Sequence, residues 1–254
     1  MHYICLCPTY GRPSMPANAL QLFLGQDLRL GDTAVLEIFD DAGQIAAQQG
    51  KLFHNRAYRV ISQEEWIPLP HKYNAHLQRL GGILEDPETV YVCWDDDDVY
   101  LPGHLVAIRE ALDRHPGAGW AHPAMVYSTY DERRPPRIPA DEPPRIERAA
   151  GRFHGALAVR GDLLAKLNGW PDTDLATYDQ QMLASLRASP VANTAAGRFP
   201  RYCYRWQDTA AWHCSGSIDE TGRYKKPPIQ EPGHVDQLVP RYDASTKQIL
   251  DWLT

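Results

Sequence analysis

Short apolar runs and amphipathic stretches alternate along the first hundred residues of the chain. The apolar runs predict strands at 3–7, 35–39, 58–61 and 89–94, and the amphipathic stretches predict helices at 15–24 and 72–80. Pro8 ends the first strand, and Gly81 and Gly82 close the second helix. Strands that alternate with helices predict a largely parallel sheet with helices on both faces, an α/β fold.

The second half of the chain continues this pattern. The predicted helices are 102–114, 162–169, a helix that begins after Thr177, and 245–253, and the predicted strands are 120–127, 156–160 and 201–206. Pro102 falls in the first turn of its helix and Asp162 caps the next one. Thr177 and Gln180 form a capping box, which places Asp179 in the first turn of a helix.

A polar, proline-rich stretch interrupts the second half at 131–152. It holds six arginines against five acidic residues, so it is a mixed-charge excursion and no basic arm. Its length predicts a functional loop over a site, with a mobile surface insertion as the alternative.

Composition narrows the class of protein. With 254 residues, 43% hydrophobic and 23% charged, the sequence predicts one folded domain over 1–254. No apolar run reaches membrane-spanning length and no signal peptide precedes the first strand, which predicts a cytoplasmic protein. A net charge of -6 gives no general attraction to nucleic acid, and the five cysteines lack zinc-knuckle spacing.

Four consecutive carboxylates, Asp95 to Asp98, follow the apolar run 90–94 directly. Carboxylates repel one another and resist burial, so such a cluster at a strand end indicates a cation, and Mg²⁺ and Mn²⁺ prefer oxygen ligands. If the extended backbone continues, Asp95 and Asp97 point the same way, which is the D-x-D spacing of a metal and nucleotide site. The alternative is an acidic turn with solvated side chains.

The order of several short motifs along the chain resembles one family. These are P-T-Y-G-R-P, D-D-A-G, K-Y-N, W-D-D-D-D-V-Y-L-P, G-W-P-D and Y-D-Q-Q-M. Together they resemble the GT-A glycosyltransferases of family 2, over most of the chain. The resemblance implies a GT-A fold, with a nucleotide-binding half at 1–102 and an acceptor-binding half at 103–254.

The resemblance also implies an activity. The protein would be a metal-dependent, inverting hexosyl or related transferase that moves a sugar from a nucleotide-diphosphate sugar, a UDP-sugar, to an acceptor hydroxyl. The cofactor would be Mn²⁺ or Mg²⁺. The acceptor would be a saccharide, a small molecule or a modified DNA base.

Individual residues take roles by the same resemblance. The base and ribose would be surrounded by Thr9, Tyr10, Arg12 and Asp41, with Asp40 beside them and Lys72 and Asn74 close to the nucleotide. Asp95 and Asp96 would face the nucleotide sugar, and Asp97 would hold the metal with Asp98 in support. His213 would supply a late metal ligand, with a purely structural histidine as the alternative.

Asp179 is the residue expected to act as general base. A carboxylate there would take the proton of the acceptor hydroxyl in one displacement, which inverts the anomeric centre. The family commonly has glutamate where this chain has Tyr178. The alternative is an acidic residue favoured at a helix start by the helix dipole.

Three other interpretations stay open at this stage. A phage-type enzyme that glycosylates hydroxymethylated DNA bases would use the arginines of 131–152, and a nucleotidyltransferase would need a glycine-rich phosphate loop that residues 8–13 do not supply. A non-catalytic module would bind a nucleotide sugar without turnover. The residues expected to shape an acceptor pocket are Trp120, His122, Arg152, His154 and Trp170. Arg223, Lys225 and Lys226 lie on a loop expected to fold over the diphosphate, with solvated surface charge as the alternative.

Overall fold

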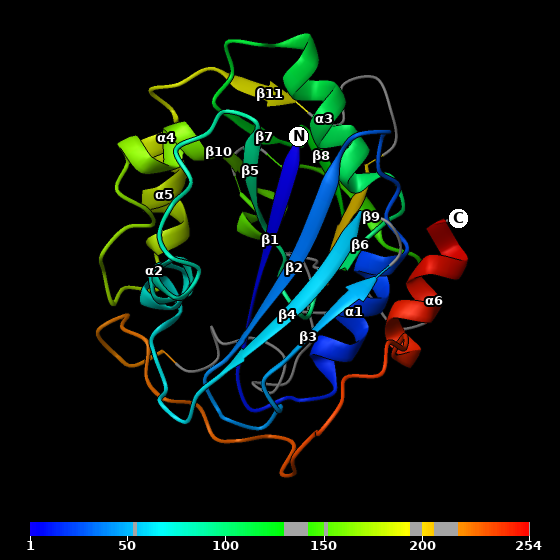
Figure 1. Cartoon of the computed structure of the whole chain (residues 1–254), viewed down its shortest axis with the longest axis vertical. Helices are drawn as coiled ribbons and strands as arrows, with labels where there is room; N and C mark the ends of the chain where they lie inside the picture. Colours follow the sequence, from blue (N-terminus) through cyan, green and yellow to red (C-terminus); the bar gives the residue numbers. More distant parts are fainter. Residues whose placement is uncertain (53–54, 130–141, 150–151, 194–199, 206–217, 254) are drawn as a thin grey trace.

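The computed structural model describes residues 1–52, 55–129, 142–149, 152–193, 200–205 and 218–253 (Figure 1). The strands are β1 (His2–Thr9), β2 (Thr33–Asp40), β3 (Gln48–Leu52), β4 (Arg56–Ser62), β5 (Thr89–Cys93), β6 (Val99–Tyr100), β7 (Trp120–His122), β8 (Met125–Ser128), β9 (Arg145–Arg148), β10 (Ala158–Arg160), β11 (Val191–Asn193) and β12 (Tyr202–Tyr204). The helices are α1 (Met15–Leu24), α2 (Leu69–Arg79), α3 (His104–Arg114), α4 (Gly161–Lys166), α5 (Tyr178–Leu186) and α6 (Ala244–Leu253), with a 3₁₀ turn, η1 (His154–Ala156).

Eight strands form the central sheet, in the order β11-β7-β10-β5-β1-β2-β4-β3. The pairs β1 with β2, β1 with β5, β2 with β4 and β7 with β11 are parallel, whereas β10 and β3 run antiparallel to their neighbours. The predicted α/β class with a mostly parallel sheet is therefore confirmed.

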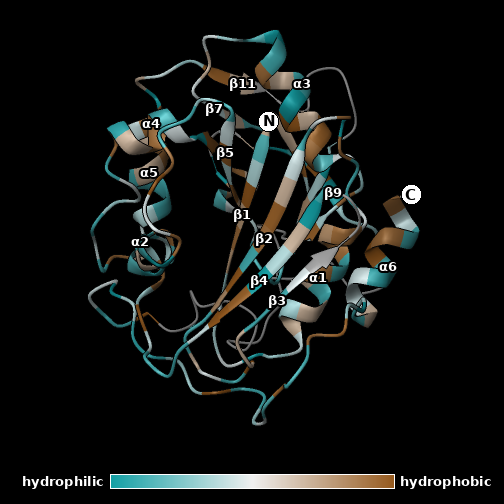
Figure 2. Ribbon diagram, viewed as in Figure 1, coloured by the Kyte–Doolittle hydropathy of each residue, from teal (hydrophilic) through white to brown (hydrophobic). Residues whose placement is uncertain are grey.

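Helices cover both faces of this sheet, as the sequence predicts (Figures 1 and 2). Along β1, Tyr3 and Cys5 point into one buried cluster and Ile4 and Leu6 into another, because strand side chains alternate. The first cluster is completed by side chains of α1, α3 and α6, and the second by side chains of α2, α4 and α5. In Figure 2, α5 and α6 carry alternating hydrophilic and hydrophobic bands, as expected for helices with one face on the sheet.

Pro8 does not end the first strand, contrary to the sequence prediction. Trp94 donates its backbone N–H to the carbonyl of Leu6 (2.9 Å), so Pro8, two residues later, faces the same side. Strand β5 has already ended there at Cys93, opposite Leu6. The N–H that proline lacks is thus not needed by a neighbouring strand, and β1 continues to Thr9.

The predicted strand over 120–127 is two strands in two sheets. Residues 120–122 are β7 of the central sheet, and 125–128 are β8 of a four-stranded sheet ordered β6-β12-β8-β9. Pro123 lies between them. Strand β9 comes from the proline-rich stretch 131–152, whose residues 130–141 and 150–151 lie outside the described part.

Three predicted helix starts need correction. The side chain of Thr177 makes no capping hydrogen bond, so the capping box does not form, although α5 does begin at Tyr178. Helix α3 begins at His104, after Gly103 at φ +82°, and leaves Pro102 outside. Asp162 lies in the first turn of α4, and Arg160 occupies the N-cap position.

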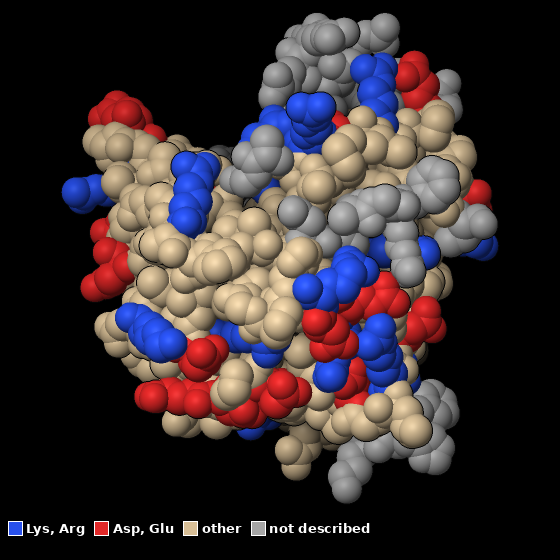
Figure 3. All heavy atoms as spheres, turned by 90° about the horizontal axis from the view of Figure 1, so that it is seen from above, with Lys and Arg blue, Asp and Glu red and all other residues tan. Residues whose placement is uncertain are grey.

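Among the described residues, none of the helices has the length and apolar character to cross a bilayer. Cys5, Cys7, Cys93 and Cys203 are free and buried. Figure 3 shows the end of the molecule where β1 begins, and basic and acidic side chains are intermixed on that face.

Candidate active site

A cavity of about 380 Å³ lies at the carboxyl ends of β1 and β5. Arg12 enters it from the segment after β1, Asp95 to Asp98 from the segment after β5, and Asp179 from the first turn of α5. Its remaining lining residues are Pro8, Leu69, Arg152, Phe153, His154, Gly155, Ala176, Tyr178, Gln180, Tyr204 and Tyr224. The chain thus gathers distant segments at the sheet edge where open α/β folds bind ligands.

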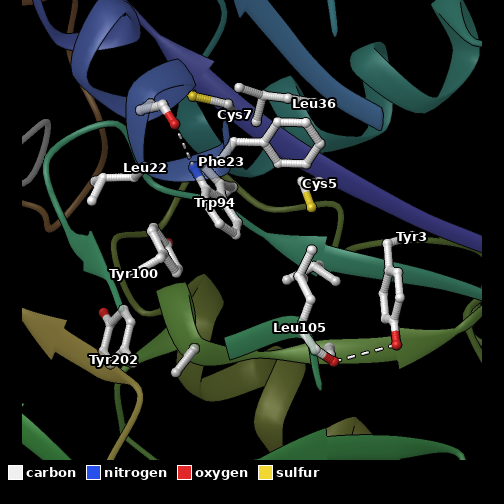
Figure 4. Close-up of a cluster of buried hydrophobic side chains, with 14 of the residues drawn as sticks. Tyr3, Cys5, Cys7, Leu22, Phe23, Leu36, Trp94, Tyr100, Leu105 and Tyr202 are labelled. Atoms are coloured by element: carbon white, nitrogen blue, oxygen red, sulfur yellow. Dashed lines mark hydrogen bonds between the residues drawn. The ribbon is translucent and has the colours of Figure 1, made fainter. Parts of the chain in front are cut away.

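The four aspartates sit on a turn that two aromatic rings close. Trp94, before the turn, and Tyr100, after it, are fully buried and stack with ring centroids 3.9 Å apart (Figure 4). The Trp94 indole donates to the carbonyl of Ala19 in α1 (3.3 Å). The Tyr100 hydroxyl accepts from the backbone N–H of Asp95 (2.7 Å) and donates to the carbonyl of Gly155 (3.0 Å). The core therefore holds both ends of the acidic segment.

The expectation that extended backbone aligns Asp95 and Asp97 is wrong. Strand β5 ends at Cys93, and Asp96 and Asp97 occupy a turn. Asp95 and Asp97 nevertheless both line the cavity, because the turn curls beneath it.

Two residues of the first loop hold Asp96 in place. Its carboxylate accepts from the hydroxyl of Thr9 (2.6 Å) and from Arg12 Nη2 (2.7 Å). Arg12 Nη1 also reaches Asp97 Oδ2 at 3.4 Å. Arg12 is itself buried, so this pairing offsets part of the cost of burying both charges.

Asp98 is tied to the second sheet and, through Arg205, to the C-terminal helix. It accepts from the hydroxyl of Tyr202 and from the backbone N–H of Arg205 (2.9 Å). The buried guanidinium of Arg205 donates to the carbonyl of Asp97, to Asp243 (2.9 Å) and to Thr246 (2.8 Å). The positively charged guanidinium of Arg205 thus links the acidic turn to the start of α6.

Burial makes two of these carboxyl groups unusually hard to ionise. The pKa of Asp95 is raised to about 7, first by burial and then by the neighbouring charge of Asp97, while a hydrogen bond from Tyr73 (3.0 Å) opposes the shift. The pKa of Asp98 is raised well above its usual range by burial and by Asp97 and Asp95. Ionising all the carboxyl groups of this turn at once is therefore unfavourable.

The backbone of Gly155, in the turn η1, lies close to the carboxyl groups of Asp95 and Asp98. A Cβ atom there would lie 2.6 Å from Asp95 Oδ2, 2.7 Å from Asp98 Oδ2 and 2.9 Å from the Tyr202 hydroxyl. Only glycine fits between these oxygens without displacing one of them.

An aromatic layer supports the cavity from behind. Tyr73 stacks on Trp170 (centroids 4.8 Å), and His154 packs edge-on against Tyr73 and Tyr178. Burial lowers the pKa of His154 to about 3, so the ring is neutral and its Nε2 accepts from the Trp170 indole (2.9 Å). Asn74 exchanges hydrogen bonds with the backbone of Trp170 at 2.8 and 3.0 Å and so fixes this layer.

Asp179 faces the cavity from the first turn of α5. Its Oδ1 accepts from the backbone N–H of Gln180 (2.7 Å) and its Oδ2 from the Gln180 side chain (3.3 Å).

The residues predicted for the nucleoside end form a separate group. Asp41 and Lys72 make a fully buried ion pair (2.7 Å), and Lys72 lies 5.7 Å from the ring centre of Tyr10. Burial raises the pKa of Asp41, against the effect of Lys72. A small hollow of about 10 Å³ touches Tyr10, Lys72 and Trp66 and shares Leu69 and Tyr224 with the main cavity.

The structure brings most of the predicted residues together and separates a few. Arg12, the four aspartates and Asp179 share the cavity, with Thr9 bonded to Asp96. Asp40 instead accepts backbone N–H groups of Ala42, Gln44 and Ile45 and shapes its own turn. Among the acceptor-side candidates, Arg152 and His154 line the cavity and Trp120, His122 and Trp170 do not. His213 lies outside the described residues.

Sequence reasoning missed the residues Phe153, Gly155, Tyr202, Tyr204 and Arg205. They come from short segments without a periodic pattern, and only their distance from the acidic turn in space marks them. The one sequence feature that could have indicated this segment is Gly155 in R-F-H-G, which follows a histidine and precedes an apolar run.

The donor set suits a hard divalent cation. Its side chains offer carboxylate oxygens, the ligands that Mg²⁺ and Mn²⁺ prefer. Within the described part of the chain, no three His, Cys, Asp or Glu side chains converge on one point as a ready-made cage. That matches a site in which one or two carboxylates bind the ion and substrate phosphates complete its shell.

Together, the sheet order, the helical layers and the cavity at the strand ends define the class of fold: it is the GT-A fold of the glycosyltransferases, as predicted. The solved structures that match include those of TarS from S. aureus. TarS 1–349 in complex with UDP matches with a TM-score of 0.56 and 13% identity, over 82% of this chain and 61% of that one.

Two further TarS structures match to a similar degree. The complex of TarS 1–349 with UDP-GlcNAc gives a TM-score of 0.55 at 13% identity, over 82% of this chain and 60% of that one. Against whole TarS the values are 0.54 and 14%, over 81% of this chain and 37% of that one, so the chain spans a little over a third of TarS. No protein-family model and no curated protein sequence matches the chain.

Proposed function

We propose that this protein is a metal-dependent, inverting glycosyltransferase that uses a nucleotide-diphosphate sugar, a UDP-sugar, as donor and a hydroxyl group as acceptor. The observation that carries the proposal is that the acidic turn and Asp179 line one cavity at the edge where β1 and β5 end. The TarS structures with UDP and UDP-GlcNAc support a uridine donor.

The charge of the cavity explains why a metal is part of the proposal. Five carboxylates line it against the two guanidinium groups of Arg12 and Arg152. A diphosphate would be repelled from such a surface unless a cation came with it. A divalent ion held by Asp97 would neutralise charge on the departing diphosphate.

The remaining carboxylates then have supporting roles in this proposal. Asp96 and Arg12 pair with each other, which keeps the guanidinium at the cavity wall beside Asp97. Asp98 is engaged by Tyr202 and by the Arg205 N–H, so it holds the shape of the turn. The Asp41–Lys72 pair and Tyr10 would meet the nucleoside end, and Asn74 would act by holding Trp170.

Asp179 would accept the proton of the acceptor hydroxyl. It lies in the first turn of α5, and the Gln180 contacts fix its orientation. Attack from the side opposite the leaving diphosphate inverts the anomeric carbon. The free, buried cysteines fit a reducing compartment, and we propose the cytoplasm.

Thermal unfolding with a set of nucleotide sugars, with and without Mn²⁺, tests this function. A ligand that binds only the folded protein raises the Tm, so we expect a rise for a UDP-sugar only when metal is present. Silence across all donors would sink the proposal.

A variant pair separates binding from turnover. Asp179→Asn should keep the donor-dependent rise in Tm and lose transfer, by roughly 100-fold or more in kcat. Asp172→Asn, on the exposed loop before α5, serves as the matched control and should transfer normally. Full turnover by Asp179→Asn would remove Asp179 from the mechanism.

A further inference from the structure

We infer that Phe153, with Tyr204, forms the platform on which the acceptor lies, and that the acceptor is an uncharged saccharide. The inference rests on the proposed glycosyl transfer and names the class of substrate that the same cavity takes. It draws on the backbone of Phe153, on the rings around it and on the charge of the cavity.

The backbone of Phe153 is strained where the cavity wall turns. Its φ is +64°, and Asn168 (φ +59°) is the other non-glycine residue with positive φ among those described. Asparagine tolerates this left-handed conformation, whereas phenylalanine has no side-chain hydrogen bond to offset it. Strained residues of this kind cluster at ligand sites, and Phe153 lines the cavity.

Two neighbours of the Phe153 ring complete a mixed surface. Tyr204 packs against it at 5.1 Å between ring centroids, tilted by 58°. The guanidinium carbon of Arg152 lies 5.1 Å from the ring centre, and Arg152 is paired with Glu147 at 2.8 Å. An aromatic face beside hydroxyl and guanidinium donors suits a sugar, which presents C–H groups on one face and oxygens at its rim.

A second aromatic pair lines the same cavity near Asp179. Tyr178 directly precedes Asp179, and Tyr224 packs edge-on against Tyr178 with centroids 6.2 Å apart. An acceptor on the Phe153 platform would therefore share the cavity with the proposed base.

The charge of the cavity selects against an anionic acceptor. Five acidic side chains and only two arginines line the cavity, and one of these arginines is paired with Glu147. The proposed metal would be matched by the donor diphosphate. A phosphate-rich acceptor such as DNA would meet net repulsion, whereas a neutral saccharide would not.

Calorimetric titration of the full chain with UDP and Mn²⁺ present tests the inference. The probes are maltotriose, cellotriose and chitotriose as neutral ligands, trigalacturonate as an acidic one, and a short duplex carrying 5-hydroxymethylcytosine. We expect binding by at least one neutral trisaccharide and none by trigalacturonate or the duplex. Binding confined to trigalacturonate or the duplex, or no binding by any probe while UDP and Mn²⁺ do bind, would overturn the inference.

Four variants locate the binding surface. Phe153→Ala and Phe153→Gly both remove the ring, and we expect each to weaken trisaccharide binding about tenfold or more while UDP affinity stays the same. The two variants should differ in Tm. The glycine variant should have the higher Tm, because only glycine adopts a positive φ without strain. Phe153→Tyr should retain binding. Asn168→Gly is the matched control. It removes the same kind of backbone strain, a positive φ, at a residue that does not line the cavity, and it should leave trisaccharide affinity unchanged.

The outcomes separate this inference from the function on which it rests. If Phe153→Ala binds the trisaccharide as the natural chain does, the platform is wrong while the glycosyltransferase proposal stands. If neither UDP nor any UDP-sugar binds with Mn²⁺, the proposed function fails and this inference fails with it.

Discussion

Asp95 and Asp97 lie two residues apart but meet different surroundings. Asp95 accepts from the buried Tyr73 hydroxyl, whereas Asp97 faces Arg12 across 3.4 Å and its backbone carbonyl accepts from Arg205. A proton on Asp95 relieves the repulsion between the two carboxylates. At neutral pH the charge of the acidic turn therefore depends on whether Asp95 carries a proton.

The raised pKa of Asp95 predicts a pH dependence of stability in the metal-free protein. With a folded pKa of about 7 and an ordinary value when unfolded, Asp95 binds a proton on folding between about pH 4 and pH 7. Its contribution to the unfolding free energy therefore falls by up to about 1.4 kcal/mol per pH unit as pH rises from about 4, and is lost above about pH 7. Urea unfolding of the natural chain and of Asp95→Asn from pH 5 to 8 measures this: the natural chain should lose stability relative to the variant up to about pH 7, and the difference between them should then level off. A difference that stays constant would contradict it.

Replacing Asp97 should remove metal-dependent donor binding. Asp97→Asn keeps the size of the side chain but takes away the charge beside Arg12, and we expect roughly a 100-fold loss in kcat or more. Titration of Mn²⁺ in the presence of UDP measures the binding step directly. Asp236→Asn, whose side chain is 98% exposed, is the control and should behave like the natural chain.

The sequence identifies the carboxylates but not their geometry. A run of aspartates directly after an apolar strand can be recognised in the sequence as a candidate site, because carboxylates resist burial and are not expected next to a buried strand. The ring stack of Trp94 on Tyr100, which makes the run a turn, depends on α1 and on Gly155, far away in the sequence. The expectation of a straight D-x-D strand failed for this reason.

At the scale of elements, the turn η1 packs so closely against the acidic turn that no side chain larger than that of glycine fits at position 155. Gly155→Ala would place a methyl group within 2.7 Å of carboxylate oxygens of Asp95 and Asp98. We expect a loss of about 1–3 kcal/mol in unfolding free energy and weaker donor binding, because one of the two oxygens has to move. Gly117→Ala, with no atom within 4 Å of its new Cβ, should leave donor binding unchanged. Equal donor affinity in the two variants would show that η1 does not shape the site.

The elements themselves were largely predictable, and the exceptions share a cause. Strands β1, β2 and β5 and helices α1 and α6 follow hydrophobic patterns that one sheet face imposes. Strands β6 and β9 have two and four residues and were not predicted, because no local pattern marks them. Strands β8 and β12 fall within or next to the predicted strands 120–127 and 201–206, but their pairing in a second sheet depends on residues far apart in the sequence. That pairing places Tyr204 at the cavity, which is why Tyr204 and Phe153 were missed while Arg152 and His154 were predicted.

At the scale of the whole molecule, Arg205 connects the acidic turn to the C-terminal helix. Its guanidinium contacts the carbonyl of Asp97 and also Asp243 and Thr246 at the start of α6. Helix α6 in turn packs Ile249 into the cluster on one face of the sheet. The site therefore depends on docking of a helix that is about 150 residues later in the sequence.

We expect Asp243→Asn to weaken both the fold and the site. Arg205 would lose its charged partner while buried, which costs about 1–3 kcal/mol, and the Asp97 carbonyl would lose a fixed donor. Chemical unfolding and UDP titration with Mn²⁺ measure the two effects. Asp251→Asn, on the exposed side of the same helix, should change neither. Normal donor affinity in Asp243→Asn would separate α6 from the site.

Crystals grown with Mn²⁺ and UDP, measured at a wavelength where manganese scatters anomalously, test the central claim most directly. We expect one anomalous peak about 2.1–2.3 Å from a carboxylate oxygen of Asp97, bridged to both phosphates of UDP. A diphosphate bound in the cavity with no metal at Asp97, or a metal bound away from the turn 95–98, would contradict the claim.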